Sequence, residues 1–286
     1  MSLAYSRQKF QDWFTQQWVI LWGRKIDPKN VPWLIGPFGN LNGIGEEFIV
    51  QLAEKENLII ERNAKAKGLL PSINELHFTE AELSALSKKV IGFYEKTSNY
   101  KLDFTVKWNP FFKIFGILVI KLFSDRLNQL NIPTKNLKNP EELKSEIITL
   151  SDPVSNEVKY TIWFRTFKTT GQVIYSGVYS TCTLPSGKTC VKAVFPLPNG
   201  NATVIMTPGV QKNGALSLES SGKKFGDAGF YFLLNDSRGR YWSQFVRSFR
   251  DKLTIGTENE FLFAEQKLTL WHQRVLNLHY KIEEKI

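Results

Sequence analysis

The sequence predicts an α+β fold, in which a helix-rich N-terminal region precedes an antiparallel β meander that forms a barrel or a sandwich. Two observations predict it. Before about residue 134, apolar side chains recur every three or four positions, which is the spacing of a helix. From Lys144 onward the apolar period falls to two, and turn sequences interrupt it about every ten residues. We therefore expect a helical region over residues 1–134 and an antiparallel β domain of about ten strands over residues 144–286.

Composition places the chain among ordinary globular proteins. Its 286 residues are 42% hydrophobic and 22% charged, and this length is sufficient to bury a substantial core. The aromatic content is high, with 21 Phe, 8 Trp and 9 Tyr. So many rings need either a thick core or a ligand cavity, and a core is the commoner reason.

The first residues do not resemble a secretory signal. Polar side chains interrupt every apolar run after Met1, whereas a signal peptide needs about seven or more uninterrupted apolar residues. We therefore predict a cytoplasmic protein. Cys182 and Cys190 flank a three-residue loop with Gly187 in its left-handed position, so the two side chains face each other across a hairpin. In a reducing compartment, two buried thiols are favoured over a bridge.

The net charge of +10 raises the question of nucleic-acid binding. Residues 1–150 hold 20 Lys and Arg against 16 Asp and Glu, and residues 151–286 hold 17 against 11. The excess is spread over the chain, with no basic tail and no nucleic-acid-binding motif. A solvated sheet face is therefore favoured over a polyanion site, and nucleic acid is not an expected partner.

Helices are expected at three places in the N-terminal region. Residues 5–22 carry an aromatic stripe at helical spacing, and Glu46 to Glu56 repeats the same period. Between them, Asp27 to Gly45 is rich in Gly and Pro and is expected to be a loop. A third helix begins at Thr79, where Thr-Glu-Ala-Glu forms a capping box, and continues to about Tyr94.

The segment Pro110 to Leu130 contains seven uncharged residues between Lys113 and Lys121. It is too short and too interrupted to span a bilayer, which takes about 20 apolar residues. Two interpretations remain open: a buried helix against the β domain, which is favoured, or a helix lying on a membrane surface over Pro110–Phe123. After it, Lys135 to Glu142 is polar and contains proline, which is typical of a linker.

Strands are predicted wherever the period is two, and turn residues separate them. The predicted strands are Ser145–Leu150, Val158–Phe167, Gln172–Leu184, Thr189–Phe195, Ala202–Thr207, Ala215–Ser220, Gly229–Leu234, Arg240–Phe249, Lys252–Thr257, Phe261–Leu270 and Arg274–Ile282. No long helix follows the last of them. The helix-grip fold ends in such a helix, so a lipocalin-like up-and-down barrel is favoured.

The chain carries no catalytic or metal-binding motif. There is no Gly-X-Ser-X-Gly elbow, no His-Glu-X-X-His sequence and no paired-cysteine metal motif. His272 and His279 lie seven residues apart near the C-terminus, and an enzyme would use one of them with Asp227 as an acid–base pair. We expect no metal and no cofactor.

The most distinctive sequence runs from Ser220 to Tyr231, with three glycines, Lys223, Lys224 and Asp227 between two strands. The favoured interpretation is a wide hairpin loop whose Asp227 bonds its own backbone. The alternative is a loop at the barrel mouth, where the two lysines and the aspartate orient the polar head of a ligand.

Several sequences resemble those of an uncharacterised family of bacterial proteins. They are Tyr175–Ser180 (YSGVYS), Phe195–Ala202 (FPLPNGNA), Ser221–Asp227 (SGKKFGD) and Phe123–Asn131 (FSDRLNQLN). The resemblance covers both halves of the chain and implies a bacterial source. The family has no assigned activity, so it implies no mechanism and no functional residue.

The leading hypothesis is a binding protein that holds a small hydrophobic or amphipathic ligand in an aromatic-lined cavity of the β domain. An enzyme of unknown reaction and a peripheral membrane or partner-docking protein are the alternatives. The expected ligand-binding residues are Trp163, Arg165, Phe195, Lys223, Lys224, Asp227, Tyr231, Trp242 and Arg247.

Overall fold

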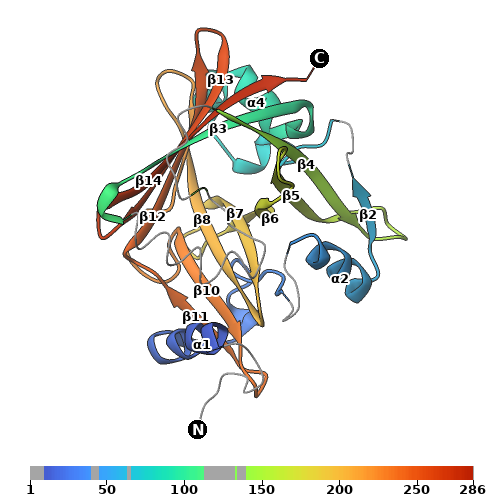
Figure 1. Cartoon of the computed structure of the whole chain (residues 1–286), viewed down its shortest axis with the longest axis vertical. Coiled ribbons are helices and arrows are strands. Elements are labelled where there is room, and N and C mark those ends of the chain that lie inside the picture. Colours follow the sequence, from blue (N-terminus) through green and yellow to red (C-terminus); the bar gives the residue numbers. More distant parts are fainter. Residues whose placement is uncertain (1–9, 40–44, 63–65, 113–132, 134–139, 286) are drawn as a thin grey trace.

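The computed structural model describes residues 10–39, 45–62, 66–112, 133 and 140–285, and its central feature is a closed antiparallel β-barrel of ten strands (Figure 1). Around the ring the strand order is β8-β7-β6-β5-β4-β3-β14-β13-β12-β9, and β9 returns to β8. The bounds are β3 Tyr100–Trp108, β4 Glu141–Ser151, β5 Val158–Phe167, β6 Val173–Thr183, β7 Thr189–Leu197, β8 Gly200–Val210, β9 Leu216–Glu219, β12 Phe249–Glu258, β13 Phe261–Leu270 and β14 Gln273–Glu284. The barrel form, rather than a sandwich, is confirmed.

Strand β3 closes the ring although it belongs to the N-terminal region. It lies between β4 and β14, and its partner Glu284 faces Tyr100 at the far end of the chain. Alternate β3 side chains from Tyr100 to Trp108 are buried in the barrel, while Lys101 and Lys107 are exposed. The sheet therefore crosses the predicted boundary between residues 134 and 144, and the division into two domains stays a prediction.

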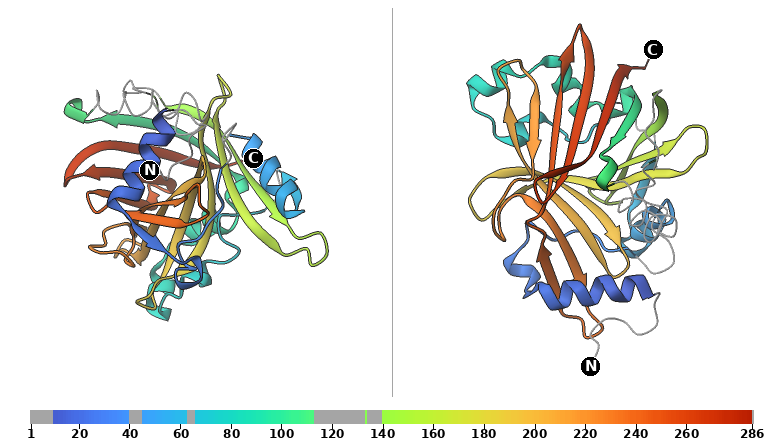
Figure 2. Two further views of the ribbon diagram at one scale, coloured as in Figure 1. Left: turned by 90° about the horizontal axis from the view of Figure 1, so that it is seen from below. Right: turned by 60° about the vertical axis from the view of Figure 1, so that its left-hand side comes forward.

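The sheet branches at strand β8, which pairs with two different strands along one edge. Its first half, Gly200 to Ile205, pairs with β10 (Gly229–Asn235), whereas its second half pairs with β9. From β10 a branch continues through β11 (Tyr241–Phe245) to β1 (Arg24–Ile26). Helix α1 (Phe10–Trp22) lies across this branch and contacts β10 and β11 (Figure 2, right).

Short helices close one end of the barrel. Helix α3 (Glu80–Ala85) and helix α4 (Lys88–Glu95) follow the 3-10 turn Ile73–Leu76, and their apolar residues join the barrel core together with Leu69. We call this set of elements, residues 69–95, the cap. On the outside, helix α2 (Glu47–Glu56) packs Phe48, Ile49 and Leu52 against β4, β5 and β6, beside the short strand β2 (Ile59–Arg62).

The structure corrects three details of the sequence prediction. The strand predicted over Arg240–Phe249 is two strands, because residues 246–248 form a turn between β11 and β12. The third helix breaks at Leu86 and Ser87, where the backbone is extended, although its capping box at Thr79 is present as predicted. Strands β1, β2 and β3 were not predicted. The helix predicted over Pro110–Phe123 lies outside the described residues from 113 onward.

The hairpin that carries the two cysteines has the predicted geometry. Cys182 lies directly opposite Cys190 in the β6–β7 register, and Gly187 in the connecting loop has a φ of 81°. Both thiols are free, and burial raises the pKa of Cys182 to about 12. Because the thiolate is the reactive form, these two side chains behave as core residues.

Candidate functional site

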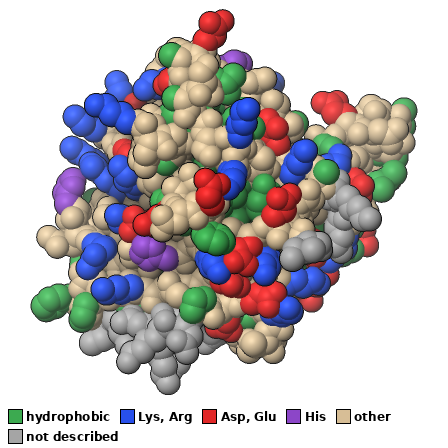
Figure 3. All heavy atoms as spheres, turned by 90° about the horizontal axis from the view of Figure 1, so that it is seen from above, with side chains coloured by type: hydrophobic (Ala, Val, Ile, Leu, Met, Phe, Trp, Pro, Cys, Tyr) green, Lys and Arg blue, Asp and Glu red, His purple; other side chains and the backbone are tan. Residues whose placement is uncertain are grey.

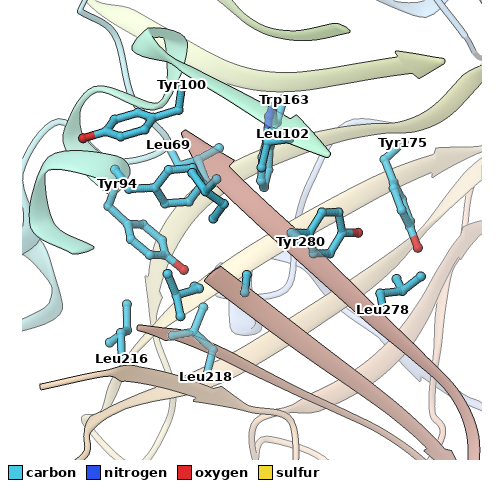
Figure 4. Close-up of a cluster of buried hydrophobic side chains, with 14 of the residues drawn as sticks. Leu69, Tyr94, Tyr100, Leu102, Trp163, Tyr175, Leu216, Leu218, Leu278 and Tyr280 are labelled. Carbon is cyan, nitrogen blue, oxygen red and sulfur yellow. The ribbon is translucent and has the colours of Figure 1, made fainter. Parts of the chain in front are cut away.

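The barrel interior contains a cavity of about 60 Å³ directly beneath the cap. Leu69, Phe93 and Tyr94 of the cap form its upper wall, and aromatic side chains of the strands form its sides. Figure 4 shows Tyr94 projecting from α4, with Trp163 and Tyr175 on the neighbouring strands β5 and β6. The cavity is apolar over most of its surface, and only a few polar groups reach it.

Arg165 is the cation of this cavity. Its side chain is 5% exposed, and it enters the interior from β5 beside Trp163. The guanidinium carbon lies 3.8 Å from the centroid of the Trp163 ring and 4.5 Å from that of Tyr175, so two rings hold it by cation–π contact. Its Nη2 donates a long hydrogen bond of 3.5 Å to Tyr179. Among the described residues, Nε has no hydrogen-bond partner and no carboxylate lies within ion-pair distance.

Asp251 is the acid of the same cavity and enters from β12 on another side of the ring. Gln266 Nε2 donates a 2.7 Å hydrogen bond to its Oδ2, while Oδ1 has no partner in the described part of the chain. Burial raises the pKa of Asp251 to about 7, against the smaller opposite effect of the Gln266 hydrogen bond. Asp251 therefore changes its protonation state near neutral pH.

Three tyrosines complete the polar lining. Tyr175, Tyr179 and Tyr280 all reach the cavity, and Figure 4 shows the Tyr280 hydroxyl pointing toward Tyr175. Burial raises the pKa of Tyr280 to about 12 and also raises the pKa values of the other two, so all three are neutral hydrogen-bonding groups. The interior thus offers a fixed positive charge, a titrating acid and neutral hydroxyls within an aromatic wall.

Gly177 makes room for this aromatic wall. It lies directly opposite Trp163 in the β5–β6 register, between Tyr175 and Tyr179 on the inward face. A Cβ at this position would lie 2.9 Å from the Phe195 ring and 3.1 Å from the Tyr179 ring. The missing side chain therefore allows the neighbouring rings to meet where a larger residue would separate them.

Three of the residues expected to bind ligand lie at this cavity, namely Trp163, Arg165 and Phe195. Tyr231 lies elsewhere, in a second buried cluster between the branch and the loop that contains Trp33. Trp242 is also in the branch, where its indole N–H donates to Asp236 at 2.9 Å. The structure does not bring these two residues to the cavity.

The remaining expected residues lie on the surface. The Asp227 carboxylate accepts hydrogen bonds from the backbone N–H groups of Lys223 and Lys224, which is the hairpin-loop geometry that the sequence favoured. The two lysine side chains are exposed, as is Arg247 in the turn between β11 and β12. The Asp227 carboxylate therefore stabilises the turn of its own loop.

The histidines of the enzyme hypothesis are both exposed. His272 lies in the β13–β14 turn, while His279 is on β14, 3.1 Å from Asn277 Nδ2 and 3.6 Å from a Glu265 oxygen. The contacts of Asp227 described above are to its own loop. Within the described residues, no group of three or more His, Cys, Asp or Glu side chains has the arrangement of a metal site.

Sequence reasoning missed Asp251, Gln266 and the three tyrosines. For Asp251 a signal was present, because it shares one face of β12 with Leu253 and Ile255, whereas Lys252 is exposed on the other face. The predicted strands end at Phe249 and resume at Lys252, so the prediction leaves Asp251 between them. An aspartate in register with an apolar face is the observation that identifies it.

Fold and cavity together define a class: an antiparallel β-barrel with a buried, partly polar interior and a helical cap. No protein-family model matches the chain, and no solved structure matches it. The chain is similar to the uncharacterized membrane protein YndJ of Bacillus subtilis strain 168, with 25% identity over 242 residues. The match covers 84% of this chain and 41% of that protein. The resemblance to uncharacterised bacterial proteins is thereby confirmed.

No helix within the described residues is both long enough and apolar enough to cross a membrane.

Proposed function

We propose that the barrel is a binding site for a small amphipathic anion, with the anionic group at Arg165 and the apolar part against the aromatic wall. One observation carries the proposal. Arg165 is a buried cation with an unpartnered Nε and without an ion pair among the described residues, and it faces a cavity. A buried charge costs several kcal/mol unless an opposite charge compensates it, about 3–5 kcal/mol in proteins where one partner of a buried pair is removed. A bound anion supplies that compensation.

Asp251 is not a full substitute for the ligand. Its pKa of about 7 leaves it partly protonated at neutral pH, and it lies beyond ion-pair distance from the guanidinium. When protonated it is a hydrogen-bond donor to a ligand oxygen. When ionised it repels an anion. We therefore expect the affinity for an anion to fall as the pH rises through 7.

The size of the cavity limits the ligand. A volume of 60 Å³ corresponds to about two water molecules at about 30 Å³ each, which fits a small anionic head group. A larger apolar part, such as the ring of an aromatic carboxylate, requires the cap residues Leu69, Phe93 and Tyr94 to move outward. This ring has ten strands, whereas lipocalins have eight, so the lipocalin-like form is not confirmed.

Calorimetric titration with benzoate tests the proposal, with benzylamine as a probe of similar shape and opposite charge. Benzoate is expected to bind at pH 6, more weakly by about tenfold at pH 8, and benzylamine is expected not to bind. Native mass spectrometry of the freshly purified protein complements the titration, because a molecule that co-purifies identifies the natural ligand.

Two variants locate the site. Arg165→Met keeps an unbranched apolar side chain but removes the guanidinium charge, and it is expected to abolish benzoate binding. Lys192→Met is the matched control, because Lys192 is also a buried cation but donates to the Ile35 carbonyl outside the cavity. Equal benzoate affinity in the wild type and Arg165→Met, or equal binding of benzylamine, contradicts the proposal.

The other hypotheses remain predictions. The enzyme that uses His272 or His279 with Asp227 lacks a contact between these side chains in the described hydrogen bonds. The cytoplasmic location also stays a prediction, and the relative YndJ is itself called a membrane protein.

A further inference from the structure

Three segments meet at the end of the barrel where β3 and β13 end and where β12 and β14 begin. Asn109, just after β3, donates from its backbone N–H to the Val275 carbonyl at 2.9 Å and from its side chain to the Arg274 carbonyl at 2.8 Å. The Trp271 backbone N–H donates to the Ser248 carbonyl at 2.9 Å. These bonds join the chain after β3, the β13–β14 turn and the β11–β12 turn, on the left in Figure 1.

Two aromatic rings project from this junction into solvent. Phe111 is 92% exposed and Trp271 is 66% exposed. Trp271 and His272 form the β13–β14 turn with φ values of 47° and 63°. Such turns strongly favour Asn-Gly, since a bulky residue with positive φ is strained. The turn therefore holds a large apolar ring outward in a conformation that is intrinsically unfavourable for tryptophan.

Four cations lie on the strands and turns at this end of the barrel. Lys107, Arg247 and Arg274 are exposed and Arg250 is half-buried. Strand β13 lies between β12 and β14, and its Thr269 pairs with Arg250 on one side and with Arg274 on the other. None of the four has an ion pair within the described residues. Farther along the same strands, Lys252 and Lys267 are each paired with a glutamate. Figure 3 shows Lys and Arg side chains gathered on this side of the molecule.

We propose that this junction, which we call the aromatic–basic end (Lys107, Phe111, Arg247, Arg250, Trp271 and Arg274), docks the protein on an anionic phospholipid surface. Tryptophan prefers the interfacial layer of a bilayer, and a neighbouring phenylalanine adds apolar area. The uncompensated cations attract the phosphates and anionic head groups beneath them. A hairpin tip that presents separate rings suits this layer better than single-stranded nucleic acid, which stacks its bases along a groove.

Co-sedimentation of the full chain with vesicles tests the docking. Phosphatidylcholine vesicles with about 30% phosphatidylserine are expected to pellet the wild type, and pure phosphatidylcholine vesicles are not. Raising the salt to about 0.5 M is expected to release most of the protein, because it screens the charges.

Variants of the aromatic–basic end separate docking from folding. Trp271→Asn suits the positive φ, so it is expected to leave the melting temperature unchanged or higher while reducing vesicle affinity about tenfold. The double reversal Arg250→Glu with Arg274→Glu is expected to reduce vesicle affinity about 30-fold or more, given about fivefold per cation. The thermal transitions of both variants are measured alongside.

Matched controls use residues of the same kind elsewhere on the surface. Trp22→Ala removes a ring that is 72% exposed at the end of α1. Lys159→Glu on β5 with Lys168→Glu in the turn after it makes the same change in net charge. Both controls are expected to pellet like the wild type. The proposal is overturned if the wild type shows no preference for anionic vesicles, if the controls lose binding as much, or if a single-stranded oligonucleotide alone binds at these residues.

Discussion

Two buried aspartates of the described chain have arginine and aromatic neighbours, but their hydrogen bonding differs. In the branch, Asp236 is 0% exposed and accepts four hydrogen bonds, from two backbone N–H groups and from the side chains of Arg240 and Trp242. In the barrel, Asp251 is 6% exposed and accepts one side-chain hydrogen bond, and Arg165 lies in the same cavity without an ion pair among the described residues.

The two acids differ in their pKa for this reason. Burial acts to raise the pKa of Asp236, but the hydrogen bonds from Trp242 and the Arg238–Arg240 segment outweigh it and hold the pKa below its ordinary value. Burial of Asp251 is not offset and raises its pKa to about 7. The comparison teaches that burial of an acid does not identify a ligand site. The distinguishing property is unused hydrogen-bonding capacity that faces a cavity.

The largest expected effect on stability comes from removing Asp236, the acid that accepts four hydrogen bonds. Asp236→Ala leaves a buried indole N–H, two backbone N–H groups and part of the Arg240 guanidinium without an acceptor, so we expect the free energy of unfolding to fall by about 5 kcal/mol. Urea denaturation measures it. Asp236→Asn, which keeps an acceptor oxygen, is expected to lose less. A loss below about 1 kcal/mol for the alanine variant removes the contrast between the two acids.

The second prediction concerns the pH dependence that Asp251 introduces. With a pKa of about 7 in the folded state and about 3.9 when unfolded, Asp251 has no effect on stability below about pH 4, where both states are protonated. As the pH rises to 7 the unfolded state ionises first, so folding becomes less favourable by about 4 kcal/mol.

Asp251→Asn removes this dependence. Denaturation of both proteins at pH 4.5 and pH 8 measures the difference, and the wild type is expected to lose stability relative to the variant as the pH rises. Parallel curves for the two proteins show that Asp251 is ionised in the folded state at both values, which contradicts its place in an unsaturated site.

The smallest effect distinguishes two buried tyrosines. Tyr231 in the branch donates a short hydrogen bond of 2.5 Å to the Asp227 carbonyl and accepts one from the Gly226 N–H, so Tyr231→Phe is expected to cost about 1.5 kcal/mol. Tyr175→Phe is expected to change stability by less than about 0.5 kcal/mol but to weaken benzoate binding. A larger loss of stability for Tyr175→Phe than for Tyr231→Phe contradicts the inference that polar groups at the cavity lack hydrogen-bond partners.

Most strands of the barrel were predictable because their signals are local. Turn residues such as Gly187, Asn199 and Gly214 lie between alternating runs, and all three have positive φ in the structure. Strand β3 was missed even though Tyr100, Leu102, Phe104, Val106 and Trp108 alternate cleanly with polar residues. It pairs with strands distant in sequence, so it has no adjacent hairpin turn, which is the local signal that marks the other strands.

The candidate site was predictable only in part. Arg165 and Trp163 were expected at the ligand because they are polar and aromatic residues of an apolar strand. Tyr231 has the same local pattern but lies in a different cluster. Its strand pairs with the first half of β8 outside the closed ring, and this long-range pairing determines which cluster its side chain joins. Asp251 lies between two predicted strands, and its place inside the barrel depends on pairing between β12 and its neighbours.

The position of β3 between β4 and β14 has a consequence for how the protein is made. Strand β3 leaves the ribosome long before β14, and until residues 273–284 emerge both β3 and β13 present open edges that attract other strands. Local hairpins such as β6–β7 form early, whereas the final closure joins residues far apart in the chain and is slow. The barrel cavity is therefore complete only after β14 has emerged, and until then the open strand edges are exposed to other chains.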